Sequence, residues 1–351
     1  MEDDFRSKVG IIYLGTRGGG NELTKKLCEA IDNWHNATFQ SLCLSSSNVQ
    51  IAAFDDIPVK KIEIISGVNI RSLIRVLLLS LRPRKLRELL NLSQGSYVIF
   101  PMVSPFDIPL NLSLRLGGVR VIRFLHDAQR HPGDIWPGKI TIWLLQRLAD
   151  TLILLSEYVK SLLPSDSQEK SIVISHPAFD FQNRLETSSP NHYGRYVLFV
   201  GRIRRYKGLD QLLDAWASIS TKDNLKLLIA GEGRIKQTLP PEVITKNEWL
   251  TESTIDFLIR NAELVIFPYQ EASQSGLIPF AMSLGKRIVI TPVGGLMEQV
   301  GNYNGAVTCR AVGSSAIREG IEQALLIDGK SVQTPGIAPN WAEKLRILLN
   351  E

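Results

Sequence analysis

Two cations in the second half of the sequence lie where a phosphate ligand is expected. The apolar run Tyr196–Val200 ends at Gly201, and Arg202 and Lys207 follow five residues apart, just before a helical pattern. In open α/β sheets, ligands bind at the carboxyl ends of the strands. A diphosphate there would meet backbone N–H groups, the forked guanidinium of Arg202 and the point charge of Lys207. The spacing therefore predicts a diphosphate site, with a basic loop that binds nothing as the alternative.

A second segment combines a helix start with a carboxylate. After a strand predicted at 263–267, Ser275 and Gly276 stand at the beginning of an apolar helix. The free N–H groups and the dipole of a helix start favour an anion. Glu271, just before this point, could accept hydrogen bonds from sugar hydroxyls. In the alternative interpretation, Ser273 or Ser275 only caps the helix and Glu271 is a solvated loop acid.

The first half of the sequence offers a histidine beside an aspartate. His126 and Asp127 follow a strand predicted at 119–124. A histidine at the carboxyl end of a strand can hydrogen-bond a sugar hydroxyl or a developing charge. A purely structural His–Asp pair is the alternative.

A glycine-rich loop opens the chain. Gly18, Gly19 and Gly20 follow a strand predicted at 9–14, and Asn21 is a candidate N-cap for the next helix. Such glycines can admit a phosphate or an acceptor close to the backbone, and the alternative is a tight strand-to-helix turn. The loop does not fit the G-x-G-x-x-G pattern, which argues against a nicotinamide cofactor.

Composition narrows the class of protein. The chain has 351 residues, 44% apolar and 21% charged, which is typical of a folded protein of about two domains. Its net charge of +5 suits anionic small molecules or an anionic surface rather than nucleic acid. Three widely spaced cysteines and no HExxH or CxxC spacing predict a reducing compartment, no metal and no resident cofactor. Without a signal-peptide pattern or an apolar run of ~18–20 residues, a cytoplasmic protein is expected.

Predicted strands and helices alternate in both halves of the chain. In the first half the strands are 9–14, 96–100, 119–124, 151–155 and 171–174, with helices at 22–31 and 140–148. In the second half strands at 196–200, 225–230, 263–267 and 287–291 alternate with helices at 209–219, 255–261, 276–284 and 314–326. This order predicts parallel sheets covered on both faces. We predict an N-terminal domain at 1–180, a linker at 181–193, a second domain at 194–335 and a final helix within 336–351 that crosses back to the first domain.

Four blocks of the second half together resemble the family-4 retaining glycosyltransferases of GT-B fold. Gly201, Arg202, Lys207 and Gly208 match G-R-x-x-x-x-K-G, and a G-E-G-like turn follows at 231–233. A strand leads to a glycine-started helix, and 285–298 resembles G-x-P-V-I-x-T-x-x-G-G-x-x-E. The resemblance implies that Arg202 and Lys207 hold the donor diphosphate.

The resemblance also assigns roles on either side of these blocks. It implies that Gly276 and Leu277 cap the distal phosphate, and that His126, with Asp127 beside it, belongs to the catalytic site. Many family members carry two glutamates eight positions apart; Phe280 stands at the second position and Glu271 only near the first. The segment instead resembles a variant branch with S-Q-S-G, so the ribose contact does not carry over.

The resemblance implies a GT-B fold: two Rossmann-like parallel-sheet domains facing across a cleft, with the nucleotide-sugar donor on the second. The expected reaction is transfer of a hexosyl group, with retention, to a saccharide or lipid-linked saccharide acceptor. Cations and a helix dipole would meet the charge of the leaving diphosphate without a metal. Two alternatives remain: a sugar-nucleotide epimerase of the same fold, and a catalytically silent sugar-nucleotide-binding subunit.

One amphipathic segment of the first half predicts a surface. Residues 70–81 are mainly apolar, and at ~100° per residue Arg71, Arg75 and Arg82 share one sector. Pro83 should end or kink the helix. A basic amphipathic helix suits the interface of an anionic leaflet. Its alternative is an ordinary surface helix that packs its apolar face on the sheet.

Overall fold

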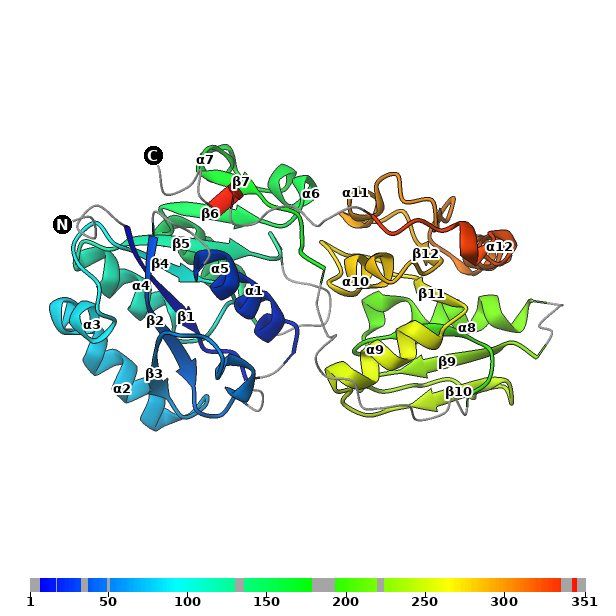
Figure 1. Ribbon diagram of the computed structural model, residues 1–351, viewed down its shortest axis with the longest axis horizontal. Coiled ribbons are helices and arrows are strands. Elements are labelled where there is room, and N and C mark those ends of the chain that lie inside the picture. The colour runs from blue at the N-terminus through cyan, green and yellow to red at the C-terminus, as the bar shows by residue number, and fades with distance from the viewer. Residues whose placement is uncertain are drawn as a thin grey trace. The chain divides into compact units, whose positions relative to one another are not determined.

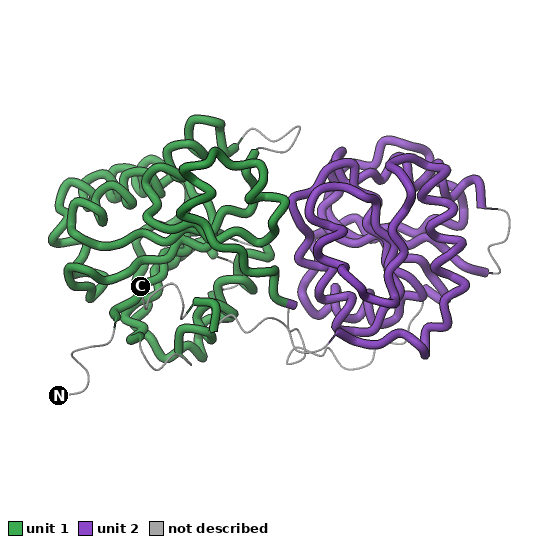
Figure 2. The backbone as a smooth tube through the Cα atoms, turned by 90° about the horizontal axis from the view of Figure 1, so that it is seen from above, with its two compact units in different colours: residues 1–130, 134–177, 339–351 green, residues 131–133, 178–338 purple. Residues whose placement is uncertain are grey.

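The structure is a computed structural model that describes residues 7–16, 18–32, 37–48, 51–129, 136–178, 193–219, 224–335 and 343–345. The chain forms two compact units (Figure 2): unit 1 takes in residues 1–130, 134–177 and 339–351, and unit 2 takes in 131–133 and 178–338. The predicted linker at 181–193 lies outside the described residues except for Tyr193, and the predicted final helix is described only at 343–345. The predicted domain limits therefore stay a prediction.

Unit 1 is built on a seven-stranded parallel sheet with the order β3-β2-β1-β4-β5-β6-β7 (Figure 1). Its strands are β1 (Ser7–Tyr13), β2 (Ala37–Ser45), β3 (Lys60–Ile65), β4 (Tyr97–Phe100), β5 (Arg120–Leu125), β6 (Thr151–Leu154) and β7 (Ser171–Val173). Its helices are α1 (Gly20–Asp32), η2 (Ile51–Phe54), α2 (Ile70–Ser80), α3 (Pro83–Leu89), α4 (Asp107–Leu116), α5 (Lys139–Leu148), α6 (Glu157–Ser161) and α7 (Ser165–Glu169). The register aligns Ile11 with Ile99 and Val98 with Val121.

Alternate side chains of the central strands serve two apolar layers, because successive residues of a strand point to opposite faces. Leu23 and Leu27 of α1 pack with Val9 and Ile99 on one face, in a cluster that also contains Leu345. On the opposite face, Val76 of α2, Leu86 of α3 and Leu110 and Leu114 of α4 pack with Ile12, Val98 and Val121, and α5 contributes Ile142 beside Leu152. Helices therefore cover both faces of the sheet, as predicted.

Unit 2 repeats the design with a six-stranded parallel sheet, in the order β10-β9-β8-β11-β12-β13. Its strands are β8 (Tyr196–Val200), β9 (Lys226–Ala230), β10 (Val243–Lys246), β11 (Leu264–Phe267), β12 (Ile288–Ile290) and β13 (Ala306–Thr308). Its helices are η4 (Arg205–Lys207), α8 (Leu209–Ala217), α9 (Glu252–Asn261), α10 (Leu277–Ser283), α11 (Leu296–Val300), α12 (Ser314–Leu326) and η5 (Gly329–Ser331). Val197 pairs with Leu227 on one side and with Leu264 on the other.

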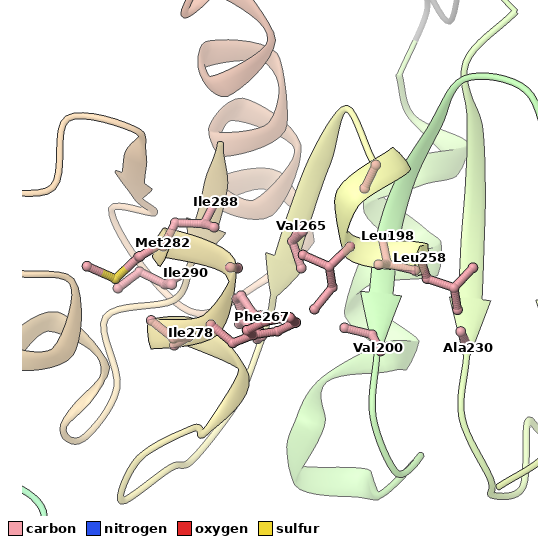
Figure 3. Close-up of a cluster of buried hydrophobic side chains, with 14 of the residues drawn as sticks. Leu198, Val200, Ala230, Leu258, Val265, Phe267, Ile278, Met282, Ile288 and Ile290 are labelled. Carbon is pink, nitrogen blue, oxygen red and sulfur yellow. The ribbon is translucent and has the colours of Figure 1, made fainter. Parts of the chain in front are cut away.

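The core of unit 2 also lies in two layers. In Figure 3, Ile278 and Met282 of α10 lie beside Phe267 and Ile290 of the sheet, within the first layer. The second layer packs Trp216 of α8 and the apolar side of α12 against the other face. Because the strands of each sheet are parallel, the carboxyl ends of its strands, and the loops that follow them, lie together along one edge of that sheet.

Each sheet has one point where the chain reverses its direction of winding. In unit 1 the strand order turns between β1 and β4, and in unit 2 between β8 and β11. Loops that follow the two strands at such a point diverge to opposite faces, which leaves room for a ligand at the carboxyl edge. We therefore expect ligands at two places. In unit 1 this place lies beside the loops at 14–20 and 101–106, and in unit 2 beside the loops at 201–208 and 268–276.

Candidate functional site

The turn point of unit 2 brings together a lysine and a tyrosine from different loops. Nζ of Lys207, which follows β8, donates a 2.9 Å hydrogen bond to Oη of Tyr269, which follows β11. The same ammonium lies 4.6 Å from the centre of the tyrosine ring. Lys207 is half-buried and, within the described part of the chain, forms no ion pair with a carboxylate. The positive charge is thus held where a ligand is expected, without an ion-pair partner among the residues with described positions.

Gly208 lets the loop after β8 come into backbone contact with the loop after β11. Gly208 has φ +71°, and a methyl group added there would lie 1.8 Å from the carbonyl oxygen of Pro268. The N–H of Gln270 donates a 2.7 Å hydrogen bond to the carbonyl of Tyr206. Only glycine fits this crossing without a shift of the backbone, because other residues disfavour positive φ and would clash. This contact between the two loops holds Lys207 next to the loop that follows β11.

The side chains of Lys207 and Leu277 converge on Gly201. A methyl group at Gly201 would lie 3.4 Å from Nζ of Lys207 and 3.7 Å from Cδ1 of Leu277. Gly201 itself has φ +116° and donates its N–H to Ala230. Two of the residues predicted for the donor diphosphate and its cap, Lys207 and Leu277, therefore meet at Gly201.

The backbone of Ser275 is held by the side chain of Gln299. Its N–H donates to Oε1 of Gln299 at 2.8 Å, and Nε2 of Gln299 donates back to its carbonyl at 3.2 Å. Its hydroxyl lies 3.4 Å from Oη of Tyr269. Helix α10 begins at Leu277, and its N-cap residue Gly276 has no side-chain cap, so the alternative interpretation, in which Ser273 or Ser275 caps this helix, is wrong.

The remaining predicted donor residues lie around this cluster. The N–H groups of Gly276 and Leu277 donate no hydrogen bond to any residue of the described ranges. Arg202 is exposed and forms no ion pair with a described residue, while Glu271 is half-buried. Phe280, which stands where a glutamate occurs in many relatives, is buried and packs in the core of unit 2.

In unit 1, His126 and the glycine loop meet at the corresponding turn point. Nε2 of His126 lies 2.8 Å from the carbonyl oxygen of Pro101, at the end of β4. A methyl group at Gly20 would lie 2.9 Å from Cγ of Met102 and 2.9 Å from Oη of Tyr13. The adjacent residues Pro101 and Met102 therefore connect the histidine to the glycine loop.

The electrostatics of this cluster favour a neutral histidine. Burial lowers the pKa of His126, while the carbonyl of Pro101 and the charge of Asp127 partly offset this. Because a carbonyl only accepts hydrogen bonds, Nε2 carries the proton and Nδ1 is the basic nitrogen of the neutral ring. Burial, with a smaller contribution from the charge of His126, lowers the pKa of His176 to about 4, although the carbonyl of Pro177 acts in the opposite direction. The two histidines are therefore close enough to interact, which the sequence did not indicate.

The glycine loop differs in detail from its prediction. Gly18 has φ +94°, and the N–H of Leu23 donates to the carbonyl of Gly19 at 3.1 Å. Helix α1 already begins at Gly20, so Asn21 lies inside the helix rather than at its N-cap. The buried amide oxygen of Asn21 accepts from Asn48 at 2.8 Å. The N-cap prediction is wrong because Asn21 is held by a neighbouring loop rather than by its own helix.

The described residues form neither a candidate metal site nor a candidate membrane span. Among the residues with described positions, no group of three or more His, Cys, Asp or Glu side chains is placed to hold a metal ion. None of the described helices has the length and hydrophobicity that a membrane span requires.

Comparison with known proteins agrees with this architecture. An uncharacterized glycosyltransferase of Methanocaldococcus jannaschii is 26% identical over 140 residues, which cover 37% of this chain and 36% of the relative. The chain spans less than half the length of the curated relatives that it matches, 36% to 45%.

Solved structures match over nearly the whole chain. An Anabaena protein in complex with UDP and glucose has a TM-score of 0.67 at 16% identity and covers 98% of this chain and 97% of its own. A sucrose-phosphate synthase from Thermosynechococcus elongatus has a TM-score of 0.68 at 15% identity, covering 98% and 95%. A putative UDP-N-acetylglucosamine 2-epimerase from Listeria monocytogenes scores 0.64 at 10% identity, covering 97% and 95%, so the fold alone does not separate transferases from epimerases.

The predicted fold class is confirmed: two parallel-sheet α/β units with the GT-B fold. Residues 194–326, which contain the cluster around Lys207 and Tyr269, match the family described as glycosyl transferases group 1.

Proposed function

We propose that this protein is a retaining glycosyltransferase of family 4, in the branch with S-Q-S-G. It moves a hexosyl group from a nucleotide-diphosphate sugar to a saccharide or lipid-linked saccharide in polysaccharide biosynthesis. The observation that carries this proposal is Lys207: a half-buried ammonium without a carboxylate partner in the described chain, held by Tyr269 at the turn point of the sheet. The match of residues 194–326 to a glycosyltransferase family supports the same class of reaction.

The chemistry follows from the charge of the leaving group. As the bond between the sugar and the diphosphate breaks, negative charge grows on the phosphate oxygens, and groups already oriented toward them stabilise the transition state. Lys207 and the exposed Arg202 supply two positive charges, and the N–H groups of Gly276 and Leu277 supply two donors. These groups can replace a metal ion, so the proposed reaction is metal-independent.

On the side of unit 1, we assign His126 to the reacting sugar. Nε2 carries the proton that is donated to the carbonyl of Pro101, and we assign the ring a contact with a hydroxyl of the reacting sugar or with the charge that develops on it. Asp127 beside it favours any positive charge that develops on the ring. The loop of Gly18, Gly19 and Gly20 is assigned to the acceptor or its phosphate.

The test is product analysis with a panel of nucleotide-diphosphate sugars. UDP-glucose comes first because the Anabaena structure holds UDP and glucose. We expect release of the nucleoside diphosphate, accelerated by a saccharide or lipid-linked acceptor, and a product whose anomeric proton coupling matches that of the donor. An inverted product would refute retention.

The two alternatives give different products. An epimerase, the class of one structural neighbour, would isomerise the sugar without net release of nucleotide. A silent subunit would raise its melting temperature with the donor but release nothing. Either result would replace the transferase proposal.

We also propose that the protein is cytoplasmic and acts as a peripheral protein at the inner face of the cell membrane. Nucleotide sugars and lipid-linked acceptors meet there. Support comes from the basic helix α2, whose surface is described next.

A further inference from the structure

The helix α2 presents an apolar stripe to solvent. Ile70 is 67% exposed and Leu81, its C-cap residue, is 78% exposed, and Ile74 and Leu77 between them are also exposed. Only Ser72 and Val76 of this helix are buried. The interpretation in which α2 packs its apolar face on the sheet is therefore wrong. A single exposed leucine needs no explanation, but a continuous apolar stripe indicates a binding surface.

Cations border this stripe on one flank. At ~100° per residue, Arg71 and Arg75 lie between the stripe and the buried side of the helix, with Arg82 just beyond its end. Arg84 and Lys85 are also exposed. The sequence has no acidic residue between Glu63 and Glu88. Every charged residue from 64 to 87 is therefore basic.

Exposed apolar residues also lie on two further helices that cover the same face of the sheet, α4 and α5. Helix α4 packs against both α2 and α5. Leu112 and Leu116 of α4 are exposed, Leu116 to 72%, and so are Ile140 and Trp143 of α5, Ile140 to 75%. Tryptophan is enriched where proteins meet the headgroup region of a bilayer. We call the exposed apolar residues of α2, α4 and α5 the apolar face: Ile70, Leu73, Ile74, Leu77, Leu78, Leu81, Leu112, Leu116, Ile140 and Trp143.

We propose that the apolar face is a docking surface for an anionic lipid bilayer. An apolar layer bordered by arginine and lysine on one flank is complementary to acyl chains beneath anionic headgroups. A second copy of this chain would bring the same cations together across a two-fold interface, which disfavours self-association. The inference deepens the proposed function, on which it rests for the lipid-linked acceptor, because it names the surface that brings unit 1 to that acceptor.

The test is flotation of the full-length protein with vesicles of phosphatidylcholine alone and with vesicles that contain 30% phosphatidylglycerol. We expect at least tenfold more bound protein on the anionic vesicles, and a loss of most of it at high salt because screening weakens surface charges. Equal binding to both vesicle types, or to neither, would overturn the proposal.

Two sets of variants separate the charge from the apolar stripe. Replacing Arg71, Arg75 and Arg82 by Glu should reduce anionic binding at least tenfold, and Ile74→Gln with Leu77→Gln should reduce it similarly without changing the charge. The matched control reverses three cations of unit 2, the exposed Arg310 and Lys330 and the half-buried Arg318, which gives the same change of net charge. Reduced binding in the control equal to that in the first set would refute the assignment to α2.

Two further measurements exclude other occupants and separate this proposal from the previous one. Concentration-dependent dimers that Ile74→Gln with Leu77→Gln abolishes, without vesicle binding, would show that the apolar face joins two copies instead. Release of nucleotide with a soluble acceptor should be unchanged in every variant, because none lies in the donor site. Flotation without turnover would refute only the proposed function. Turnover without flotation would refute only the proposal that the apolar face docks on a bilayer.

Discussion

Replacing Lys207 by methionine should separate catalysis from stability. The change removes the ammonium but keeps an apolar stem of similar length. In the free protein, Lys207 loses only its 2.9 Å hydrogen bond to Tyr269 and the adjacent ring contact, which costs about 1 kcal/mol. No carboxylate of the described chain is left unpaired by the change. The melting temperature should therefore shift by only a few degrees.

The cost to the reaction is larger, because the lost partner is a charged phosphate. A hydrogen bond to a charged group contributes roughly 1.5–3 kcal/mol, so kcat/KM should fall about 10–100-fold. The control is Lys330→Met: Lys330 is exposed, and its neighbour Gly329 lies near Arg287, at the opposite edge of the sheet. Both variants are measured by initial rates of nucleoside diphosphate release and by thermal melting. A kcat/KM for Lys207→Met within twofold of the control would refute the diphosphate assignment.

Tyr269→Phe tests the geometry within the same experiment. It removes the hydroxyl that positions Lys207 but keeps the ring, so the loss in kcat/KM should be smaller than for Lys207→Met. If Tyr269 acts only through Lys207, the double variant should be no worse than Lys207→Met alone. Additive losses would instead show a separate contact of the tyrosine with substrate.

Four further predictions follow from the same structure. Gly208→Ala should lower the free energy of unfolding by about 2 kcal/mol or more in urea titration, because φ is +71° and the methyl group would meet the carbonyl of Pro268; an unchanged midpoint contradicts this. His126→Ala should lower kcat more than it weakens donor binding measured by calorimetry, and the reverse pattern would make His126 a plain binding residue. Activity should survive excess EDTA, whereas loss that Mg²⁺ or Mn²⁺ restores would show a metal requirement. Because folding lowers the pKa of His176 from 6.5 to about 4, the unfolded chain binds more protons, and stability should fall by at most about 3 kcal/mol from pH 6.5 to 4; His176→Gln should flatten that slope, and an equal slope refutes the assignment.

The sequence predicts most interior strands of both sheets but misses the interior strand β2 and the edge strands β3, β10 and β13. β1, β4 and β8 are continuous apolar runs because both of their faces are buried. β3 at one edge instead alternates exposed and buried residues, beginning with two exposed lysines, and β10 has a single fully buried residue. Short half-exposed strands lack the apolar run on which the prediction relied.

The candidate site was predictable only where one loop contains it. Arg202 and Lys207 follow a single strand, so their spacing was visible in the sequence. Tyr269 was not, because it lies 62 residues after Lys207 in the chain and their contact depends on β8 lying next to β11. The same reason applies to the 2.8 Å hydrogen bond between Gln299 and Ser275.

The helix α2 shows why a periodic pattern alone does not decide which apolar side of a helix is buried and which is exposed. Its cations Arg71 and Arg75 mark a solvated flank, but apolar residues occupy sectors on both sides of it. The sequence therefore does not say which apolar sector meets the sheet. In the structure the small residue Ser72 and Val76 face inward, where Val76 completes the layer with α3 and α4. The exposed apolar stripe contributes nothing to the core of unit 1. Its apolar residues therefore need an explanation other than folding, and a bilayer that binds both the stripe and its arginines provides one.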